Sequence, residues 1–492
     1  MSGELQSRVQ TLEKVRELGM NPFPHAYRRT HVLAEVHDQT NYASVAGRIM
    51  GIRDHGRTTF MTIQDTSGQL QLYFMKDIND PSRYDTMREI FHRGDFIGAS
   101  GRVFRTRRGE LTVEVQDYTF LSKSLRPLPE KHAGLRDTEI RYRHRTLDLI
   151  ANPESREVFI KRSQAISLMR QFLDAHGYLE IETPLIQPIY GGANARPFIT
   201  KIHALDDQVA YLQISPELYL KRLLIGGLDR VYALTKNFRN EGIDTTHNPE
   251  FTMMECYAAY ADYHDMMDLT ERMYEFIFKK INGTTAVVHR DASGVEHSID
   301  VKTPWRRIRI YEALEQIVGV NPTGLSPDKL REVVQQRRLL PGIDSGRMAK
   351  WELVMELVRL HVEPTLIQPT FLLDHPQETT PLCKVHRENP DLIERFEPYI
   401  VGMEIGNAYT ELNDPIHQKR LLEQQAQLRE KGDEEAHPMD KDFIYAMEHG
   451  MPPTGGLGLG IDRLVMLLTR QYSIKDVIAF PMMRVEENGH NG

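Results

Sequence analysis

A segment between residues 238 and 263 places charged side chains around an apolar core: FRNEGIDTTHNPEFTMMECYAAYADY. Its Asn-Glu-Gly and Thr-His-Asn-Pro clusters favour turns, and TMMECYAAY has the composition of a buried strand. We therefore expect a hairpin, with one strand ending near Arg239 and the next beginning at Phe251. In such a hairpin Arg239 could clamp an α-phosphate or a carboxylate, Phe251 could stack on a base, and His247 could reach outer phosphates. The alternative is an ion-paired surface hairpin.

A glycine-rich segment near the C-terminus is the second candidate: PPTGGLGLGIDRLVMLL, residues 452–468. Its glycines allow backbone to approach a ligand closely, and the apolar run that follows predicts a buried helix. Arg463 at the head of that helix is an unusual residue to bury without an anion to meet. The spacing is not the G-x-G-x-x-G of dinucleotide-binding proteins, and the chain has no Walker A lysine motif.

The third candidate, GMEIGNAYTELND over residues 402–414, contains two carboxylates, Glu404 and Glu411. On a strand, Asn407, Tyr409 and Glu411 would point into the same cavity. Carboxylates beside an amide suit either Mg²⁺ shared with a triphosphate or a bound ammonium group. The alternative is the polar face of an ordinary strand turned to solvent.

Two further segments carry weaker signals. GYLEIETPLIQPIYGGANARPF, residues 177–198, predicts a strand ending at Pro184 and a polar loop that contains Gly192. QISPELYLKRLL, residues 213–224, predicts an amphipathic helix that begins near Glu217. Glu217 could be a ligand or only a favourable charge at a helix N-terminus, and the pattern does not separate the two.

The elements that would position these residues divide the chain into a small β module and a large α+β domain. Five short strands with one inserted helix have the strand count of an OB-fold barrel. We expect an N-terminal helical segment at 1–40, an OB-fold at 41–125, a Pro-containing basic linker at 126–150 and the large domain at 151–492. Helices are predicted near 154–177 and 262–282, over much of 308–362, and within 415–449.

Composition places the chain among ordinary globular proteins, with 40% hydrophobic and 26% charged residues among 492. The N-terminus lacks an apolar signal region and no run of about 18 apolar residues occurs, so no membrane span is expected. Two cysteines cannot form a disulfide framework, which favours a reducing, cytoplasmic setting.

The net charge of −8 argues against indiscriminate nucleic-acid binding, yet residues 102–145 hold eleven Lys or Arg against six acidic residues. This basic stretch is either a docking site for one polyanion or a solvated face.

Together the segments resemble the class II aminoacyl-tRNA synthetases, and among them the lysyl-tRNA synthetases of the bacterial type. HGYLEIETP is similar to motif 1 of that class, FRNEGIDTTHNPEF to motif 2 and GLGLGIDR to motif 3. GGANARPF, SPELYLKRLL, PLCK and ELND match the lysine-specific pattern, and VAGRIMGIRDHGRTTFMTIQD matches the anticodon module. The resemblance runs from about residue 42 to residue 485.

The resemblance implies a six-stranded antiparallel sheet flanked by helices, a homodimer joined through motif 1, and catalysis by Arg239 and Arg463. The implied reaction activates L-lysine with ATP and Mg²⁺ and transfers it to the 3′ end of tRNA(Lys), releasing AMP and diphosphate. The implied ATP contacts are Arg239, Glu241, His247, Asn248, Phe251, Glu404 and Arg463. The implied lysine contacts are Gly192, Glu217, Glu255, Tyr257, Asn407, Tyr409 and Glu411. Glu404 and Glu411 would bind Mg²⁺, which leaves Glu411 with two candidate roles.

For the barrel, the resemblance implies anticodon contacts by Arg48, Phe60, Gln71 and Glu114, since OB-folds stack single-stranded bases on aromatic rings beside cations. Phe60 could equally belong to the barrel core. Three rival functions remain open. A paralogue that lysylates a protein is disfavoured by the presence of the barrel, and a non-catalytic tRNA-binding relic by the presence of both arginines. Aspartyl or asparaginyl specificity is disfavoured because an acidic pocket repels aspartate.

Overall fold

The computed structural model describes residues 3–77, 80–129, 135–291 and 293–485. The chain forms two compact units, one made of residues 1–141 with 146–152 and the other of residues 142–145 with 153–492. Part of the predicted linker, residues 130–134, lies outside the described residues. Over the described ranges, no helix is long and apolar enough to cross a membrane.

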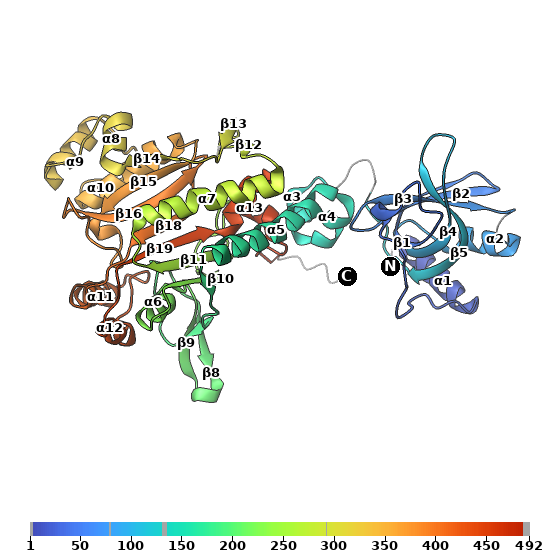
Figure 1. The fold of residues 1–492 in the computed structure, drawn as a ribbon, viewed down its shortest axis with the longest axis horizontal. Helices are drawn as coiled ribbons and strands as arrows, with labels where there is room; N and C mark the ends of the chain where they lie inside the picture. Colours follow the sequence, from blue (N-terminus) through green and yellow to red (C-terminus); the bar gives the residue numbers. More distant parts are fainter. Residues whose placement is uncertain (1–2, 78–79, 130–134, 292, 486–492) are drawn as a thin grey trace. The chain divides into compact units, whose positions relative to one another are not determined.

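The N-terminal unit is a closed five-stranded barrel with strand order β1-β2-β3-β5-β4 and one helix, α2, inserted between β3 and β4, as predicted (Figure 1). Alternate residues along the strands are buried, so one face of each strand fills the barrel. Asp80 caps α2 through the backbone N–H of Ser82, and Pro81 opens the helix. The elements are α1 (Gly3–Glu17), η1 (Leu33–Glu35), β1 (Tyr42–Asp54), β2 (Thr58–Gln64), β3 (Gln69–Met75), α2 (Pro81–Ile90), β4 (Phe96–Arg105) and β5 (Leu111–Ser122).

The second unit is built on one large sheet. Its strand order is β14-β15-β16-β18-β19-β11-β10-β6, and β17 pairs with β16. The six strands from β15 to β10 are antiparallel throughout, which confirms the predicted six-stranded sheet, and β6 and β14 extend it as parallel edge strands. The strands are β6 (Leu179–Glu180), β10 (Arg230–Phe238), β11 (Glu250–Ala259), β14 (Arg306–Arg309), β15 (Thr370–Pro376), β16 (Leu392–Ile400), β17 (Met403–Glu404), β18 (Gly406–Thr410) and β19 (Thr454–Gly460).

Three helices, α5 (Pro153–Ala175), α7 (Tyr263–Asn282) and α13 (Ile461–Thr469), pack together on one face of this sheet (Figure 1). The helices α5 and α7 confirm those predicted near 154–177 and 262–282. Asp262 caps α7, and Gly283 ends it in the left-handed conformation that glycine adopts without strain. A shorter helix, α6 (Glu217–Ile225), packs against β10 and β11.

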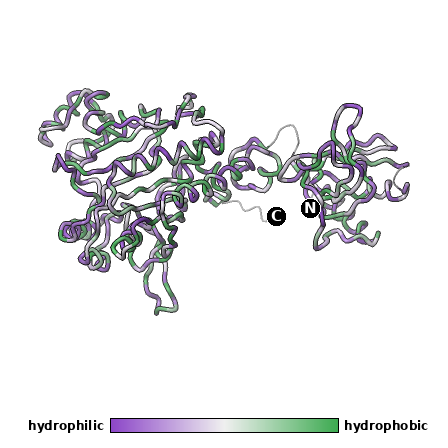
Figure 2. Tube along the Cα trace, viewed as in Figure 1, coloured by the Kyte–Doolittle hydropathy of each residue, from purple (hydrophilic) through white to green (hydrophobic). Residues whose placement is uncertain are grey.

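The remaining elements surround the sheet. The predicted helical region at 308–362 consists of α8 (Ile310–Val318), α9 (Pro327–Gln336) and α10 (Lys350–Leu357). The region at 415–449 consists of α11 (Pro415–Glu430) and α12 (Lys441–Met447). Two small sheets are formed by β12 (Ala286–Arg290) with β13 (Glu296–Asp300), and by β7 (Ile186–Gln187), β8 (Ile199–Ile202) and β9 (Gln208–Leu212). Hydrophobic and hydrophilic residues interleave along the chain instead of separating into long blocks (Figure 2).

Candidate active site

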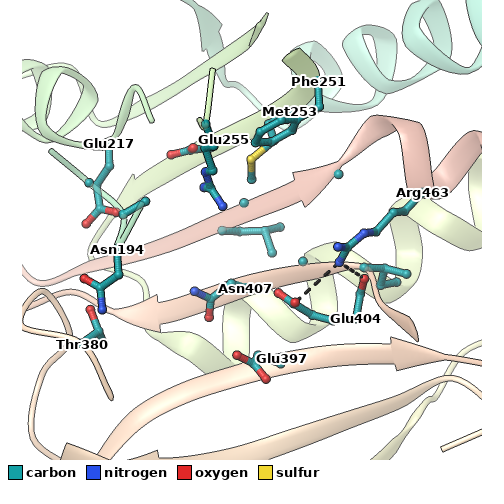
Figure 3. Close-up of a pocket in the computed structure, with 18 of the residues that line it drawn as sticks. Asn194, Glu217, Phe251, Met253, Glu255, Thr380, Glu397, Glu404, Asn407 and Arg463 are labelled. Atoms are coloured by element: carbon teal, nitrogen blue, oxygen red, sulfur yellow. Dashed lines mark hydrogen bonds and ion pairs between the residues drawn. The ribbon is translucent and has the colours of Figure 1, made fainter. Parts of the chain in front are cut away.

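A cavity of about 340 Å³ lies on the large sheet. Every site residue predicted in this unit lines it, so the structure brings the whole predicted set together from segments far apart in sequence. These residues are Gly192, Glu217, Arg239, Glu241, His247, Asn248, Phe251, Glu255, Tyr257, Glu404, Asn407, Tyr409, Glu411 and Arg463. Glu217 and Arg463 lie at opposite ends of the cavity (Figure 3).

The two-residue period of the strands explains why these side chains point into the cavity. Along β11, Met254 and Cys256 face the core beneath α5, α7 and α13, whereas Glu255 and Tyr257 face the cavity. The same alternation holds on β19, where leucines enter the core and glycines face the cavity. A Cβ at Gly456 would lie 2.0 Å from Glu411 Oε1 and 2.5 Å from a ring carbon of Tyr257, so any side chain there would displace two cavity residues. The glycine-rich segment thus makes room for side chains of neighbouring strands.

One end of the cavity carries the cations of the predicted hairpin, which the antiparallel pairing of β10 with β11 confirms. The Arg239 guanidinium carbon lies 5.1 Å from the centre of the Phe251 ring. Arg239 Nε is buried and has no hydrogen-bond partner among the described residues. The buried Oδ1 of Asn248 likewise has no partner in the described part of the chain, while its Nδ2 donates to the Glu250 carbonyl oxygen at 2.6 Å. A buried donor and a buried acceptor are therefore left for a ligand.

Arg463 stands at the start of α13 and reaches across the cavity to Glu404 (Figure 3). Its Nη1 lies 3.5 Å from Glu404 Oε2 and also donates to the Glu404 backbone carbonyl oxygen. Its Nη2 lies 3.4 Å from Nε2 of His247, whose Nδ1 is 2.8 Å from Asp244 Oδ2. Neighbouring Asp462 accepts from the Thr252 backbone N–H at 2.8 Å, which fixes the head of α13 against β11.

The other end of the cavity is acidic. Glu217, Glu255 and Glu411 are all buried there. Glu255 accepts hydrogen bonds from the Ser215 hydroxyl at 3.0 Å and the Tyr257 hydroxyl at 3.1 Å. Burial, followed by the nearby charge of Glu217, raises the pKa of Glu255 to about 7. Burial also raises the pKa of Glu217 and of Glu411 above the usual glutamate range.

Glu411 is already paired with a cation of the protein. Its Oε2 forms an ion pair with Lys221 Nζ, while Glu411 Oε1 has no hydrogen-bond partner among the described residues. The metal role predicted for Glu411 together with Glu404 therefore stays a prediction, and the geometry suggests a different partner for Glu404.

That partner is Glu397, which sequence reasoning missed. Glu397 lines the cavity, and its strand β16 pairs with β17 so that Tyr399 lies opposite Glu404. Burial and then the charge of Glu397 raise the pKa of Glu404. The sequence held a signal, because the Val401-Gly402 turn joins these two strands and folds Glu397 back beside Glu404. No group of three or more His, Cys, Asp or Glu side chains that could hold a metal occurs among the residues that the structure describes.

Arg395 is a second missed residue. Its Nε donates to Asn407 Oδ1 at 3.0 Å, and Asn407 Nδ2 donates to the Tyr409 hydroxyl at 2.5 Å. The side chain also forms an ion pair with Glu397. Arg395 thus links the predicted Asn407–Tyr409 pair to the Glu397–Glu404 pair, and fixes the orientation of groups in the middle of the cavity.

On the barrel, Phe60 belongs to a row of aromatic side chains. Its ring centre lies 4.9 Å from that of Tyr73, which lies 5.9 Å from that of Phe104. Phe60 is half-buried and lies outside the buried barrel core. Tyr73 pairs with Glu114 across β3 and β5, and Gln71 accepts from the Thr112 hydroxyl at 3.0 Å.

Arg48 is engaged elsewhere on the barrel. Its guanidinium carbon lies 4.2 Å from the centre of the Phe96 ring, and its Nη1 donates to the Gly94 carbonyl oxygen at 3.0 Å. Phe60, Gln71 and Glu114 are predicted site residues, whereas their aromatic neighbours Tyr73 and Phe104, which also stand in predicted strands, were not predicted.

Comparison with known proteins agrees with this geometry. Residues 137–484 match the family described as tRNA synthetases class II (D, K and N), and residues 43–121 match the OB-fold nucleic acid binding domain. The chain is 48% identical to a lysine–tRNA ligase of Carboxydothermus hydrogenoformans, over 97% of both chains. It is 47% identical to a lysine–tRNA ligase of Methanoculleus marisnigri, over 99% of this chain and 96% of the relative. The barrel, the sheet and the cavity between motifs 2 and 3 are therefore those of a class II aminoacyl-tRNA synthetase, and the chain belongs to the lysine–tRNA ligase family.

Proposed function

We propose that the cavity activates L-lysine with ATP to lysyl-adenylate and then transfers the lysyl group to the 3′ end of tRNA(Lys), releasing diphosphate and AMP. Membership of the family establishes lysine, ATP and tRNA(Lys) as the substrates. The roles of individual residues are our proposal. They rest on one observation: a single cavity has arginines at one end, of which Arg239 keeps a buried Nε without a partner among the described residues, and three buried carboxylates at the other end.

The acidic end matches lysine in charge. Glu217, Glu255 and Glu411 with Lys221 leave two negative charges unbalanced when all are ionised. Lysine carries an α-ammonium and an ε-ammonium group, which balance those charges, whereas aspartate would add a third negative charge. We assign the α-ammonium to Glu217 beside Gly192. The ε-ammonium is assigned to Glu255 and Glu411, with Tyr257, Asn407 and Tyr409 around the side chain.

The cationic end suits the nucleotide. Arg239 would hold the α-phosphate and the lysine carboxylate together, so that a carboxylate oxygen attacks the α-phosphorus in line and diphosphate leaves. Phe251 would stack on adenine, with Glu241 and Asn248 beside it, while His247 and Arg463 would contact the outer phosphates. No protein nucleophile is needed, because positioning and the neutralisation of developing charge supply the catalysis.

Mg²⁺ fits the site through Glu404 and Glu397. The charge of Glu397 raises the pKa of Glu404, and two neighbouring carboxylates are the donor set that Mg²⁺ takes when phosphate oxygens and water complete its shell. Glu397 and Glu404 would hold the ion, which would supply positive charge to the phosphates of ATP. Glu411 is the less suitable second ligand because it pairs with Lys221 at the acidic end, whereas Glu397 is a neighbouring carboxylate whose charge raises the pKa of Glu404.

Three further assignments belong to the same proposal. The barrel would read the anticodon through Phe60 and its aromatic neighbours with Arg48, Gln71 and Glu114. A homodimer would cover the apolar side chains exposed on β6 to β9, in and after motif 1: Leu179, Ile186, Ile199, Leu205 and Val209. We place the protein in the cytoplasm, where tRNA is charged.

The test is amino-acid-dependent ATP–diphosphate exchange with each of the twenty amino acids and Mg²⁺, before any tRNA is added. Exchange with lysine alone is expected. Exchange with aspartate or asparagine would overturn the assignment of the acidic pocket, and no exchange with any amino acid would favour a non-catalytic scaffold.

A further inference from the structure

Lys221 is a buried cation that takes no direct part in the reaction described above. Its side chain on α6 is 0% exposed, and its Nζ lies 2.5 Å from Glu217 Oε1 and in contact with Glu411 Oε2. Glu217 stands one helical turn earlier on α6, whereas Glu411 follows β18. Both carboxylates line the cavity, and Lys221 joins them from within the protein.

This arrangement is not what packing alone would select. A buried ammonium group is costly unless it is fully paired, and apolar residues of similar volume are often at least as stabilising. Here one ammonium group forms ion pairs with two carboxylates that would otherwise repel each other across the pocket. The triad Glu217–Lys221–Glu411 therefore affects the net charge of the cavity.

We propose that Lys221 is a positioning residue for the amino-acid substrate: through its contacts with both Glu217 and Glu411 it holds the two carboxylates toward the cavity and favours their ionised forms. This inference rests on the proposed function. Without Lys221 the acidic end would keep three buried carboxylates and lose the cation that pairs with two of them, so it would take up protons instead of presenting ionised acceptors to the two ammonium groups of lysine.

Most other titratable groups around Lys221 do not change their charge near neutral pH, so they do not mask its effect on the two carboxylates. Burial lowers the pKa of His437 to about 4 and raises the pKa of the Cys383 thiol well above its usual value, so both are neutral. Burial and the nearby glutamates raise the pKa of Tyr257 in the same direction. Glu255, with its pKa near 7, is the remaining group that titrates with the two carboxylates bound to Lys221.

The experiment compares the full-length protein with Lys221→Met and Lys221→Arg in lysine-dependent ATP–diphosphate exchange, from about pH 6 to about pH 9. Lys221→Met is expected to raise the KM for lysine at neutral pH by about tenfold or more, the effect of one unit in a carboxylate pKa. The difference from wild type should shrink as the pH rises, because the carboxylates ionise again. The KM for ATP should not change. Lys221→Arg keeps the charge and should keep the pH profile of the wild type.

The matched control is Lys279→Met, which removes a lysine from an exposed pair of the same spacing, with Glu275 on α7. It should change neither the KM for lysine nor the KM for ATP.

A lysine KM for Lys221→Met within twofold of wild type, or a rise that is equal at all pH values and extends to ATP, would overturn the inference. If Lys221→Met does not fold, Lys221→Gln takes its place, and if neither folds, Lys221→Arg decides. A folded Lys221→Arg that loses lysine affinity with its charge intact would refute the role of charge. A wild-type protein without lysine-dependent exchange would instead refute the proposed function.

Discussion

The Arg239 guanidinium carbon and the centre of the Phe251 ring are 5.1 Å apart at the loop end of the β10–β11 hairpin. One hairpin therefore holds the cation proposed for the α-phosphate next to the ring proposed for adenine. The hairpin is closed by the Arg239 backbone N–H, which donates to the Pro249 carbonyl oxygen at 2.9 Å. Two groups that would meet the same nucleotide are thus positioned before it binds.

Arg239→Ala should abolish lysyl-adenylate formation. Loss of a preorganised cation at a developing negative charge costs roughly 10²- to 10³-fold in rate, and here the attacking carboxylate loses its anchor as well. Lysine-dependent ATP–diphosphate exchange measures the loss, while circular dichroism and tRNA(Lys) binding should stay unchanged. Arg290→Ala, in an exposed ion pair with Glu296, is the control. Retained exchange in Arg239→Ala would refute the assigned role.

Glu397→Gln and Glu411→Gln should separate the metal site from the lysine site. Glu397→Gln is expected to raise the Mg²⁺ concentration needed for half-maximal exchange, because it removes one of two carboxylate ligands. Glu411→Gln is expected to raise the KM for lysine and to leave the Mg²⁺ requirement alone. The measurement is a Mg²⁺ titration of exchange at saturating lysine. The reverse pattern would restore Glu411 as the partner of Glu404.

Lysine affinity should fall as the pH drops through about 7. Glu255 must be ionised to accept an ammonium group, and its pKa, raised to about 7 by burial and by Glu217, places the protonated form below that pH. The KM for lysine should therefore rise on the acid side and level off only above about pH 8, where Glu411, whose pKa burial raises to about 8, is ionised as well. Glu255→Gln should bind lysine weakly with a flatter profile. An unchanged profile in this variant would show that another group controls the titration.

Phe60→Ala and Tyr73→Ala should weaken tRNA(Lys) binding without affecting the activation of lysine. Loss of base stacking on an aromatic ring costs about 1–3 kcal/mol per base, so the KM for tRNA should rise roughly fivefold to a hundredfold. Aminoacylation of tRNA(Lys) is compared with tRNA-independent exchange in the same preparations. Tyr42→Ala removes an aromatic side chain that is 51% exposed elsewhere on the barrel and serves as the control. Equal losses in both assays would point to damage to the fold.

Ile199→Asp should dissociate the proposed homodimer. Ile199 on β8 is 69% exposed, and a carboxylate buried there against a second copy would lack a partner. Analytical ultracentrifugation should show monomers for this variant and dimers for the wild type. Ile416→Asp, at a position that is 82% exposed on α11, should leave the assembly unchanged. A wild-type protein that sediments as a monomer would contradict the proposal.

Local signals in the sequence by themselves determined the barrel strands, the β10–β11 hairpin and the shared face of three cavity residues. The six antiparallel strands and most other cavity residues were predicted from the resemblance to a known family. Turn-forming clusters placed the β10–β11 hairpin, and a two-residue period put Asn407, Tyr409 and Glu411 on one face. The period also explains why Glu255 faces the cavity while its neighbour Cys256 enters the core.

Only the tertiary structure decided which charges meet. Glu397 and Glu404 come together because β16 and β17 pair, and Lys221 on α6 meets Glu411, which follows β18 almost two hundred residues later in the chain. Periodicity fixes the face on which a side chain lies, but a carboxylate takes the nearest cation in space. The choice of partner for Glu411, and with it the net charge of the lysine pocket, therefore depended on packing between distant elements.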